Sequence, residues 1–169
     1  MPVETGHEVR QELAAALGLT PAEMPEHLWN AGGARLKTLI PLTRRERLAA
    51  MTVNPSLVDH LVPRLGSTGL YAFVVEHSDA GSAHIAARHF PAGIGIIEDP
   101  ATGGSAAAPA LWLRRVGHLE GLTRLAIAQG DDMGRPCRLS VTGSGDDETG
   151  WRVGGRVVLE SPPDRAPGA

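Results

Sequence analysis

The segment that most constrains the fold is residues 105–116 (SAAAPALWLRRV), which is alanine-rich and apolar on nearly every side until Arg114 and Arg115. A helix that is apolar all round is normally a buried one, and Gly117 follows as a stop. We therefore expect residues 105–116 to form a buried helix. The rest of the chain must then supply the layers that enclose this helix.

The flanking sequence predicts short helices first and strands later. Apolar spacing, caps and stops favour helices over residues 9–17, 43–51 and 54–65, with one further turn at residues 20–23. Branched or alternating apolar residues favour strands over residues 35–42, 69–76, 83–90, 123–129, 138–141 and 151–160, the last bent at Gly154-Gly155. Residues 30–33 and 78–82 predict turns.

Together these elements predict an α+β domain over residues 1–160, in which a curled, mixed β-sheet surrounds a central buried helix. The Pro/Gly-rich residues 161–169 predict a flexible tail. A chain of 169 residues with 42% hydrophobic residues is large enough for one domain with its own core.

Composition excludes several classes of protein. No apolar run approaches the ~18 residues of a membrane span, and residues 1–10 carry Glu4 and Glu8 in place of the apolar core of a signal peptide. The single cysteine, Cys137, excludes an internal disulfide and a multi-cysteine metal site. A net charge of −3 and 4% aromatic residues argue against nucleic acid. We expect a cytoplasmic protein that binds neither nucleic acid nor membrane.

The stretch most suggestive of chemistry is residues 93–108 (GIGIIEDPATGGSAAA). The first N–H groups of a helix lack internal acceptors and carry partial positive charge. The segment Thr102-Gly103-Gly104-Ser105 at the expected helix start is therefore a candidate carboxylate or phosphate site. Asp99 is the candidate group to accept a hydrogen bond from a substrate or to move a proton. A purely structural alternative is that Thr102 or Ser105 caps the helix and Asp99 is solvated.

Two residues of the preceding strand bear on this loop. His89 lies next to it and is a candidate to orient a substrate, whereas the odd spacing from His84 places those two side chains on opposite faces of a strand. The histidines lack metal-ligand spacing, so no metal site is expected. Arg88 is expected to form a salt bridge with Glu98 or to bind loop carbonyls.

Three runs, ARHFPAGIGIIEDPATGGSAAA, LAIAQGDDMGRPCRLSV and WRVGGRVVL, resemble the C-terminal domain of the PhzF-like (phenazine biosynthesis) isomerase family. The resemblance covers about residues 12–159. It implies the diaminopimelate-epimerase-like fold, in which two similar lobes each wrap a curled sheet around a central helix and the active site lies between them. It also implies chemistry without a cofactor.

The resemblance implies specific roles for residues at the loop. Asp99 matches the aspartate that contacts substrate, and Thr102 and Gly103 match the backbone segment that binds the substrate's carboxylate. Gly104 or, after a one-residue slip, Ser105 matches the family's serine. The family's N-terminal lobe, which carries its acid/base glutamate, has no counterpart in this sequence. Cys137 lies far from the helix start, which excludes a two-thiol racemase.

Three functions follow from these observations. The first is an isomerase or epimerase that shifts a proton next to a carboxylate of a small metabolite, with the acid/base group supplied by a separately encoded lobe or by a second copy in a homodimer. The second is a non-catalytic carboxylate-binding or interaction module. The third is a single-lobe enzyme that uses Asp99 or His89 as its own base.

Overall fold

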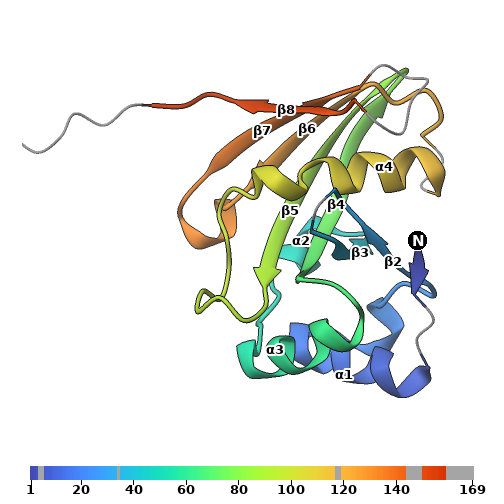
Figure 1. Ribbon diagram of the computed structural model, residues 1–169, viewed down its shortest axis with the longest axis vertical. Coiled ribbons are helices and arrows are strands. Elements are labelled where there is room, and N and C mark those ends of the chain that lie inside the picture. Colours follow the sequence, from blue (N-terminus) through green and yellow to red (C-terminus); the bar gives the residue numbers. More distant parts are fainter. Residues whose placement is uncertain (4–5, 34, 117–118, 144–149, 159–169) are drawn as a thin grey trace, which may run out of the picture.

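A computed structural model describes residues 1–3, 6–33, 35–116, 119–143 and 150–158. These residues form an eight-stranded mixed sheet whose spatial order follows the chain order (Figure 1). The strands are β1 (Pro2–Val3), β2 (Leu28–Ala31), β3 (Lys37–Leu42), β4 (Gly69–Asp79), β5 (Ser82–Pro91), β6 (Arg124–Gln129), β7 (Cys137–Thr142) and β8 (Arg152–Gly155). The helices are α1 (His7–Leu17), α2 (Arg45–Ala49), α3 (Pro55–Arg64) and α4 (Ala107–Arg115), with 3-10 turns at Pro21–Glu23, Gly103–Ser105 and Asp131–Met133.

The sheet combines parallel and antiparallel pairs and is not closed. β3 pairs with β4 and β5 pairs with β6 in parallel, and the remaining neighbours are antiparallel. Helices α2 and α3 lie in the β3–β4 connection and α4 lies in the β5–β6 connection, as parallel crossovers require. The predicted α+β class with a mixed sheet is therefore confirmed.

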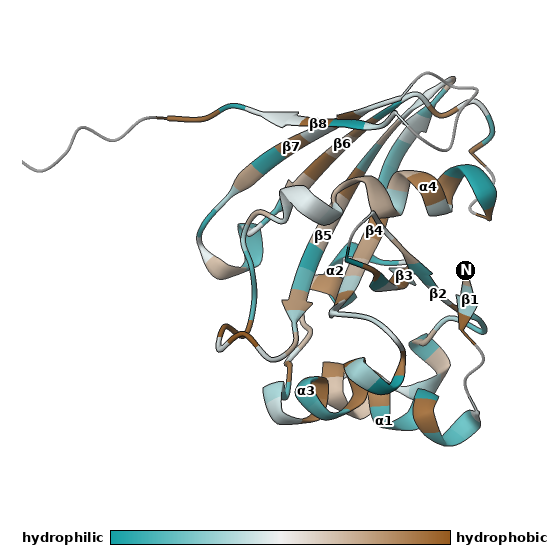
Figure 2. Ribbon diagram, viewed as in Figure 1, coloured by the Kyte–Doolittle hydropathy of each residue, from teal (hydrophilic) through white to brown (hydrophobic). Residues whose placement is uncertain are grey.

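The two faces of the sheet carry separate apolar cores. Along β3 and β4, Ile40 and Leu70 point toward α1 and α3, whereas Leu39 and Tyr71 point toward α4. This alternation follows from the two-residue repeat of a strand. Figure 2 shows apolar stretches on α1, α3, α4 and the central strands. One sheet thus separates a helical layer from the layer that contains α4.

The helix predicted over residues 105–116 begins later than expected. Gly103–Ser105 form a 3-10 turn and α4 starts at Ala107, with Pro109 in its first turn, where the missing N–H costs nothing. The helix lies across one face of the open sheet (Figure 1). It buries Ala108, Pro109, Ala110 and Leu113, whereas Trp112 is only half-buried. The predicted burial of the helix is confirmed for the side that faces the sheet.

Most predicted helices and strands are present, but the turn predicted at residues 30–33 was partly wrong and the last strand is shorter than predicted. Residues 30–33 are not simply a turn, because Leu28–Ala31 form β2. The buried Asn30 is accommodated there by hydrogen bonds with Leu65 O (2.6 Å) and the Thr38 hydroxyl (2.8 Å). The last strand covers Arg152–Gly155 and stops at the predicted bend, and residues 159–169 lie outside the described part. No helix in the described ranges is long and apolar enough to cross a membrane.

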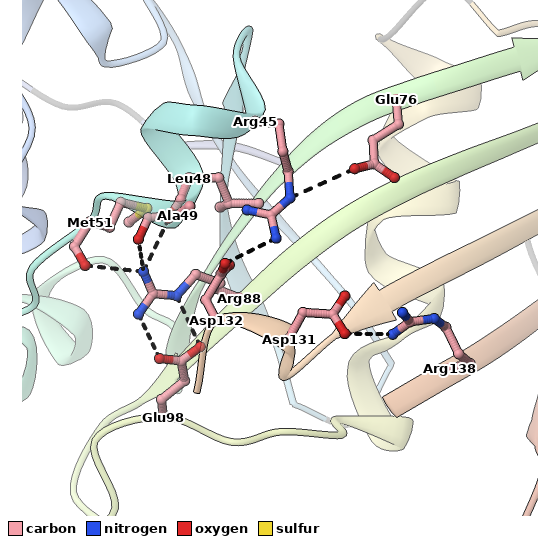
Figure 3. Close-up of polar contacts among 10 residues, drawn as sticks. All are labelled: Arg45, Leu48, Ala49, Met51, Glu76, Arg88, Glu98, Asp131, Asp132 and Arg138. Carbon is pink, nitrogen blue, oxygen red and sulfur yellow. Dashed lines mark hydrogen bonds and ion pairs between the residues drawn. The ribbon is translucent and has the colours of Figure 1, made fainter. Parts of the chain in front are cut away.

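A buried ion pair fastens the loop after β5 to the scaffold (Figure 3). Arg88 binds Glu98 through two hydrogen bonds of 3.0 and 2.7 Å, and the two side chains are only 10% and 8% exposed. The same guanidinium donates to the carbonyl oxygens of Leu48 and Met51, both at 3.0 Å, at the end of α2. The expected pairing of Arg88 with Glu98 is confirmed, and the carbonyls that Arg88 binds belong to the α2 region.

Replacement of Arg88 by methionine should destabilise the fold by about 3–5 kcal/mol, because it leaves the Glu98 carboxylate buried without its partner. The double variant Arg88→Met/Glu98→Gln should recover part of this loss. The matched control is Arg45→Met, since Arg45 is 31% exposed in its pairs with Glu76 and Asp132 and such pairs contribute about 1 kcal/mol or less. Urea unfolding measures all three variants, and equal losses for Arg88→Met and Arg45→Met would contradict the assignment.

Candidate active site

The candidate site is built where the loop after β5 returns to its own strand. The Asp99 N–H donates to the His89 carbonyl oxygen (3.0 Å), and these two residues form an antiparallel bridge. Side chains alternate on both segments. Arg88 and Glu98 therefore meet on one face, while His89 and Asp99 meet on the face that carries α4. The expectation that His84 and His89 lie on opposite faces is confirmed. Ala86 and Phe90, in step with His84, pack in the core beside α1 and α3, whereas Ile85 and Ala87, in step with His89, pack in the core beside α4.

The Asp99 carboxylate is held by its own loop. The Ala101 N–H donates to one carboxylate oxygen (3.1 Å), and the Thr102 hydroxyl donates to the other (2.8 Å). Partial burial by itself raises the pKa of Asp99, but these two hydrogen bonds and the nearby His89 outweigh burial and lower the pKa below its usual value. Asp99 is therefore an ionised acceptor at neutral pH, and its side chain remains 30% exposed.

Thr102 connects Asp99 to buried polar groups on three strands. Its Oγ1 lies 2.7 Å from His89 Nδ1 and 3.0 Å from Gln129 Nε2, which also donates to the Asp99 carbonyl oxygen (2.7 Å). Gln129 Oε1 accepts a hydrogen bond from the Tyr71 hydroxyl (3.0 Å). Burial raises the pKa of Tyr71, so the phenol stays protonated and donates. The network fixes Thr102 with its hydroxyl proton directed at Asp99.

This network places a proton on His89 Nδ1, and the lowered pKa of His89 makes the ring neutral. Since the Thr102 hydroxyl donates to Asp99, His89 Nδ1 must carry a proton and donate to Thr102. Burial, reinforced by the charge of Lys37, lowers the pKa of His89 to about 4 although Asp99 acts in the opposite direction. His89 Nε2 is buried with no hydrogen-bond partner in the described part of the chain. It lies against Gly69, where an added Cβ would approach Nε2 to 2.7 Å.

The 3-10 turn before α4 pairs several of the N–H groups at the helix start. Gly103, Ser105 and Ala106 donate to the carbonyl oxygens of Ala101, Thr102 and Gly103 at 3.2–3.3 Å. The exposed Gly104 N–H finds no acceptor within the described ranges. A Cβ added at Gly103 or Gly104 would meet nothing within 4 Å, so the space in front of both is open. Ser105 is buried at 3% exposure.

The structure thus brings together Asp99, Thr102 and His89, with Gly103 and Gly104 forming the adjoining open turn. Sequence reasoning missed Gln129, Tyr71 and Lys37. The sequence predicts that Gln129 ends the strand, yet Gln129 follows Leu125 and Ile127 at two-residue spacing and so faces the same buried side. A polar residue at such a position could have been recognised from the alternation alone.

Three surface hollows on the described part of the chain lie away from this site. The hollow of about 420 Å³ separates α4 from β2 and is lined by Trp29, Leu36 and Trp112. A second borders Phe73 and Val116, and a third borders Arg45 and Arg138. Among the described residues, no three His, Cys, Asp or Glu side chains come together as a metal site would require. The exposed Gly104 and the 30% exposed Asp99 side chain make the candidate site an open face.

Comparison with known proteins identifies the family of this chain. Residues 2–161 match the PhzC-PhzF family, whose description is phenazine biosynthesis-like protein. An uncharacterized isomerase from Mesorhizobium japonicum is 32% identical over 160 residues, which cover 88% of this chain and 52% of that protein. The chain therefore spans about half the length of this curated relative.

Solved structures share the fold. A PhzF-family phenazine biosynthesis protein from Bacillus anthracis aligns with a TM-score of 0.71 at 18% identity, over 85% of this chain and 50% of that one. A predicted epimerase from Pseudomonas aeruginosa aligns with a TM-score of 0.69 at 24% identity, over 95% of this chain and 54% of that one. With the match that covers nearly its whole length, the chain belongs to the PhzC-PhzF family of phenazine biosynthesis-like proteins.

Proposed function

We propose that the chain is one lobe of a PhzF-like, cofactor-independent isomerase or epimerase that shifts a proton on a carbon next to a carboxylate of a small metabolite. The observation that carries this proposal is the fixed, ionised Asp99 beside the free Gly104 N–H, on a segment of the family match. Family membership and the similarity to a curated isomerase support the reaction class.

In the proposed mechanism the Gly104 N–H binds the substrate's carboxylate. The open space at Gly103 and Gly104 allows a ligand to approach the backbone closely, and the start of α4 adds partial positive charge. When a base removes the neighbouring proton, negative charge spreads onto the carboxylate, and a donor already in place stabilises that charge. The exposed part of the Asp99 carboxylate accepts a hydrogen bond from a substrate amine or hydroxyl.

The base itself is proposed to come from a second chain. Asp99 has a lowered pKa, which makes it a weak base, and His89 is 3% exposed with its free nitrogen enclosed by the protein. These properties argue against a single-lobe enzyme that uses Asp99 or His89 as its base. Either a separately encoded N-terminal lobe or a second copy of this chain would supply the group and close the open face.

The surface beside the site supports association. Ile94, Ile96 and Ile97 in the loop after β5 are 58%, 48% and 58% exposed, and Figure 2 shows this loop as an apolar protrusion. Exposed apolar patches of this kind are typical of interaction sites. The alternative function, a non-catalytic carboxylate-binding or interaction module, is favoured by the same absence of a suitable base among the described site residues.

Substitution of Asp99 by asparagine should reduce activity about 100-fold or more, because a charged acceptor in the site is lost while its shape is kept. The measurement is solvent deuterium incorporation into amino-acid-like carboxylates by NMR, for the chain alone and with a candidate partner lobe. Asp79→Asn, at the exposed end of β4, is the matched control and should leave activity unchanged. Exchange by the chain alone that survives Asp99→Asn would refute this site, whereas binding without exchange under every condition would support the module.

Because folded His89 is neutral, the free energy of unfolding should decrease in acid. The unfolded chain protonates a histidine near pH 6.5, whereas folded His89 does so only near pH 4. The unfolded state therefore gains the proton first as the pH falls. The free energy of unfolding decreases by about 3 kcal/mol as pH drops from 6.5 to 4, and below pH 4 the contribution of His89 no longer changes. Urea unfolding across this range should show that slope in the wild type and not in His89→Gln. Titration of the His89 ring near pH 6.5 by NMR would contradict the prediction.

The wild-type chain should associate with itself or with a partner lobe through the loop after β5. The variant Ile94→Thr/Ile97→Thr should weaken that association at least tenfold, since each change removes exposed apolar surface that the complex would bury. Sedimentation velocity over a concentration series measures the effect. Val153→Thr, on the edge strand β8, is the control. A wild-type chain that stays monomeric and binds no partner lobe would count against a two-chain site.

A further inference from the structure

The chain contains a single lysine, and it is buried beside the candidate site. Lys37 is the only lysine among sixteen lysine and arginine residues, and it is 4% exposed at the start of β3. Its ammonium donates one hydrogen bond, to the Thr68 hydroxyl (2.8 Å). No carboxylate of the described residues lies within ion-pair distance of Lys37. Up to two of its three N–H groups therefore have no partner there.

The sheet register places Lys37 on the same face as the site. Lys37 precedes Thr38, which pairs with Leu70, so Lys37 lies beside Gly69 of β4. Two residues further along, Leu39 pairs with Tyr71, which pairs with His89 on β5. Leu39 and Tyr71 pack on the α4 side, and strand alternation puts Lys37 on that side too. Gly69, the neighbour of Lys37 in the sheet register, lies against the free nitrogen of His89.

Electrostatics also connects Lys37 with the site. Burial lowers the pKa of Lys37, the exposed Arg35 lowers it further, and Asp99 raises it. The charge of Lys37 in turn helps to keep His89 neutral. Asp99 is committed to Ala101 and Thr102 and does not pair with the ammonium. The site therefore carries a cation that its own carboxylate does not neutralise.

Burial of an ammonium without an opposite charge is unfavourable, and the carboxylate of a bound ligand would offset this penalty. We propose that the Lys37 ammonium is a ligand-binding group that pairs with the carboxylate of the small molecule bound at the Asp99 site. The proposal rests on the proposed function, because it assigns a second contact to the same ligand acid. It makes Lys37 the residue that selects anionic ligands over neutral ones.

The test uses the full chain with butyrate as the probe and sodium chloride to hold ionic strength constant. Labelling with ¹⁵N-lysine gives one Nζ signal, because Lys37 is the only lysine, and backbone labelling resolves the Gly104 amide. Butyrate should shift the Lys37 Nζ signal and raise the pKa of Lys37. A Gly104 shift without a Lys37 shift would overturn this proposal and leave the carboxylate site of the proposed function intact. A Lys37 shift alone would support Lys37 and overturn the role of Gly104, and no shift in either would overturn both.

Variants distinguish ligand binding from a structural role. Lys37→Met should weaken butyrate binding at least tenfold and leave the melting temperature unchanged or higher, because it replaces an unpaired buried charge with an apolar chain of similar length. A purely structural lysine would give the reverse, a lower melting temperature with unchanged affinity. Arg35→Met removes a nearby exposed cation and should change affinity less than twofold, which controls for long-range charge effects.

Discussion

The structure depends on the way the loop after β5 is fixed to its own strand. Arg88 and His89 are consecutive, so they face opposite sides of the sheet, and the returning residues Glu98 and Asp99 do the same. One short antiparallel bridge therefore brings a carboxylate to each face. On one face Glu98 meets the guanidinium that binds the end of α2. On the other, Asp99 enters the polar layer beneath the start of α4.

In this arrangement a structural residue, Glu98, and a candidate site residue, Asp99, are adjacent in the sequence. The Arg88–Glu98 pair is almost fully buried and holds the loop after β5 in place, whereas the Asp99 carboxylate remains partly exposed to solvent. Behind Asp99, Thr102, Gln129 and Tyr71 form a fully hydrogen-bonded chain in which each donor and acceptor role is determined. Three buried side chains joined in this way hold one another in one geometry. The acidic side chain is therefore oriented before any ligand arrives.

Sequence reasoning anticipated the elements whose signals are local. The helix Pro55–Arg64 carries a cap at Asn54 and a first-turn proline, and Asn54 Oδ1 accepts the Leu57 N–H as such a cap should. Strand β2 was missed because the run Asn30-Ala31-Gly32-Gly33 is typical of a turn. Only partners distant in the sequence make a buried Asn30 acceptable. Helix α4 likewise starts later than predicted because Gly103 and Gly104 lie in a 3-10 turn.

The site could be predicted in part for the same reason. Asp99, Thr102 and the glycines lie within six residues, so a local motif identified them, and His89 was found by its proximity to the loop. Gln129, Tyr71 and Lys37 reach the site only through strand pairing, which a single sequence does not specify. The expected ring of free amides is incomplete because the turn pairs the N–H groups of Gly103, Ser105 and Ala106 internally.

Both ends of the apolar loop are tied down. The Gly93 N–H donates to the Asp59 carboxylate (2.7 Å) at one end, and Glu98 and Asp99 are fastened at the other. The three isoleucines between these ends cannot pack into either core unless one of these hydrogen bonds or the ion pair breaks. Their contact with water is thus enforced by the backbone, and the exposed apolar surface that they add should favour clouding of the purified chain on warming.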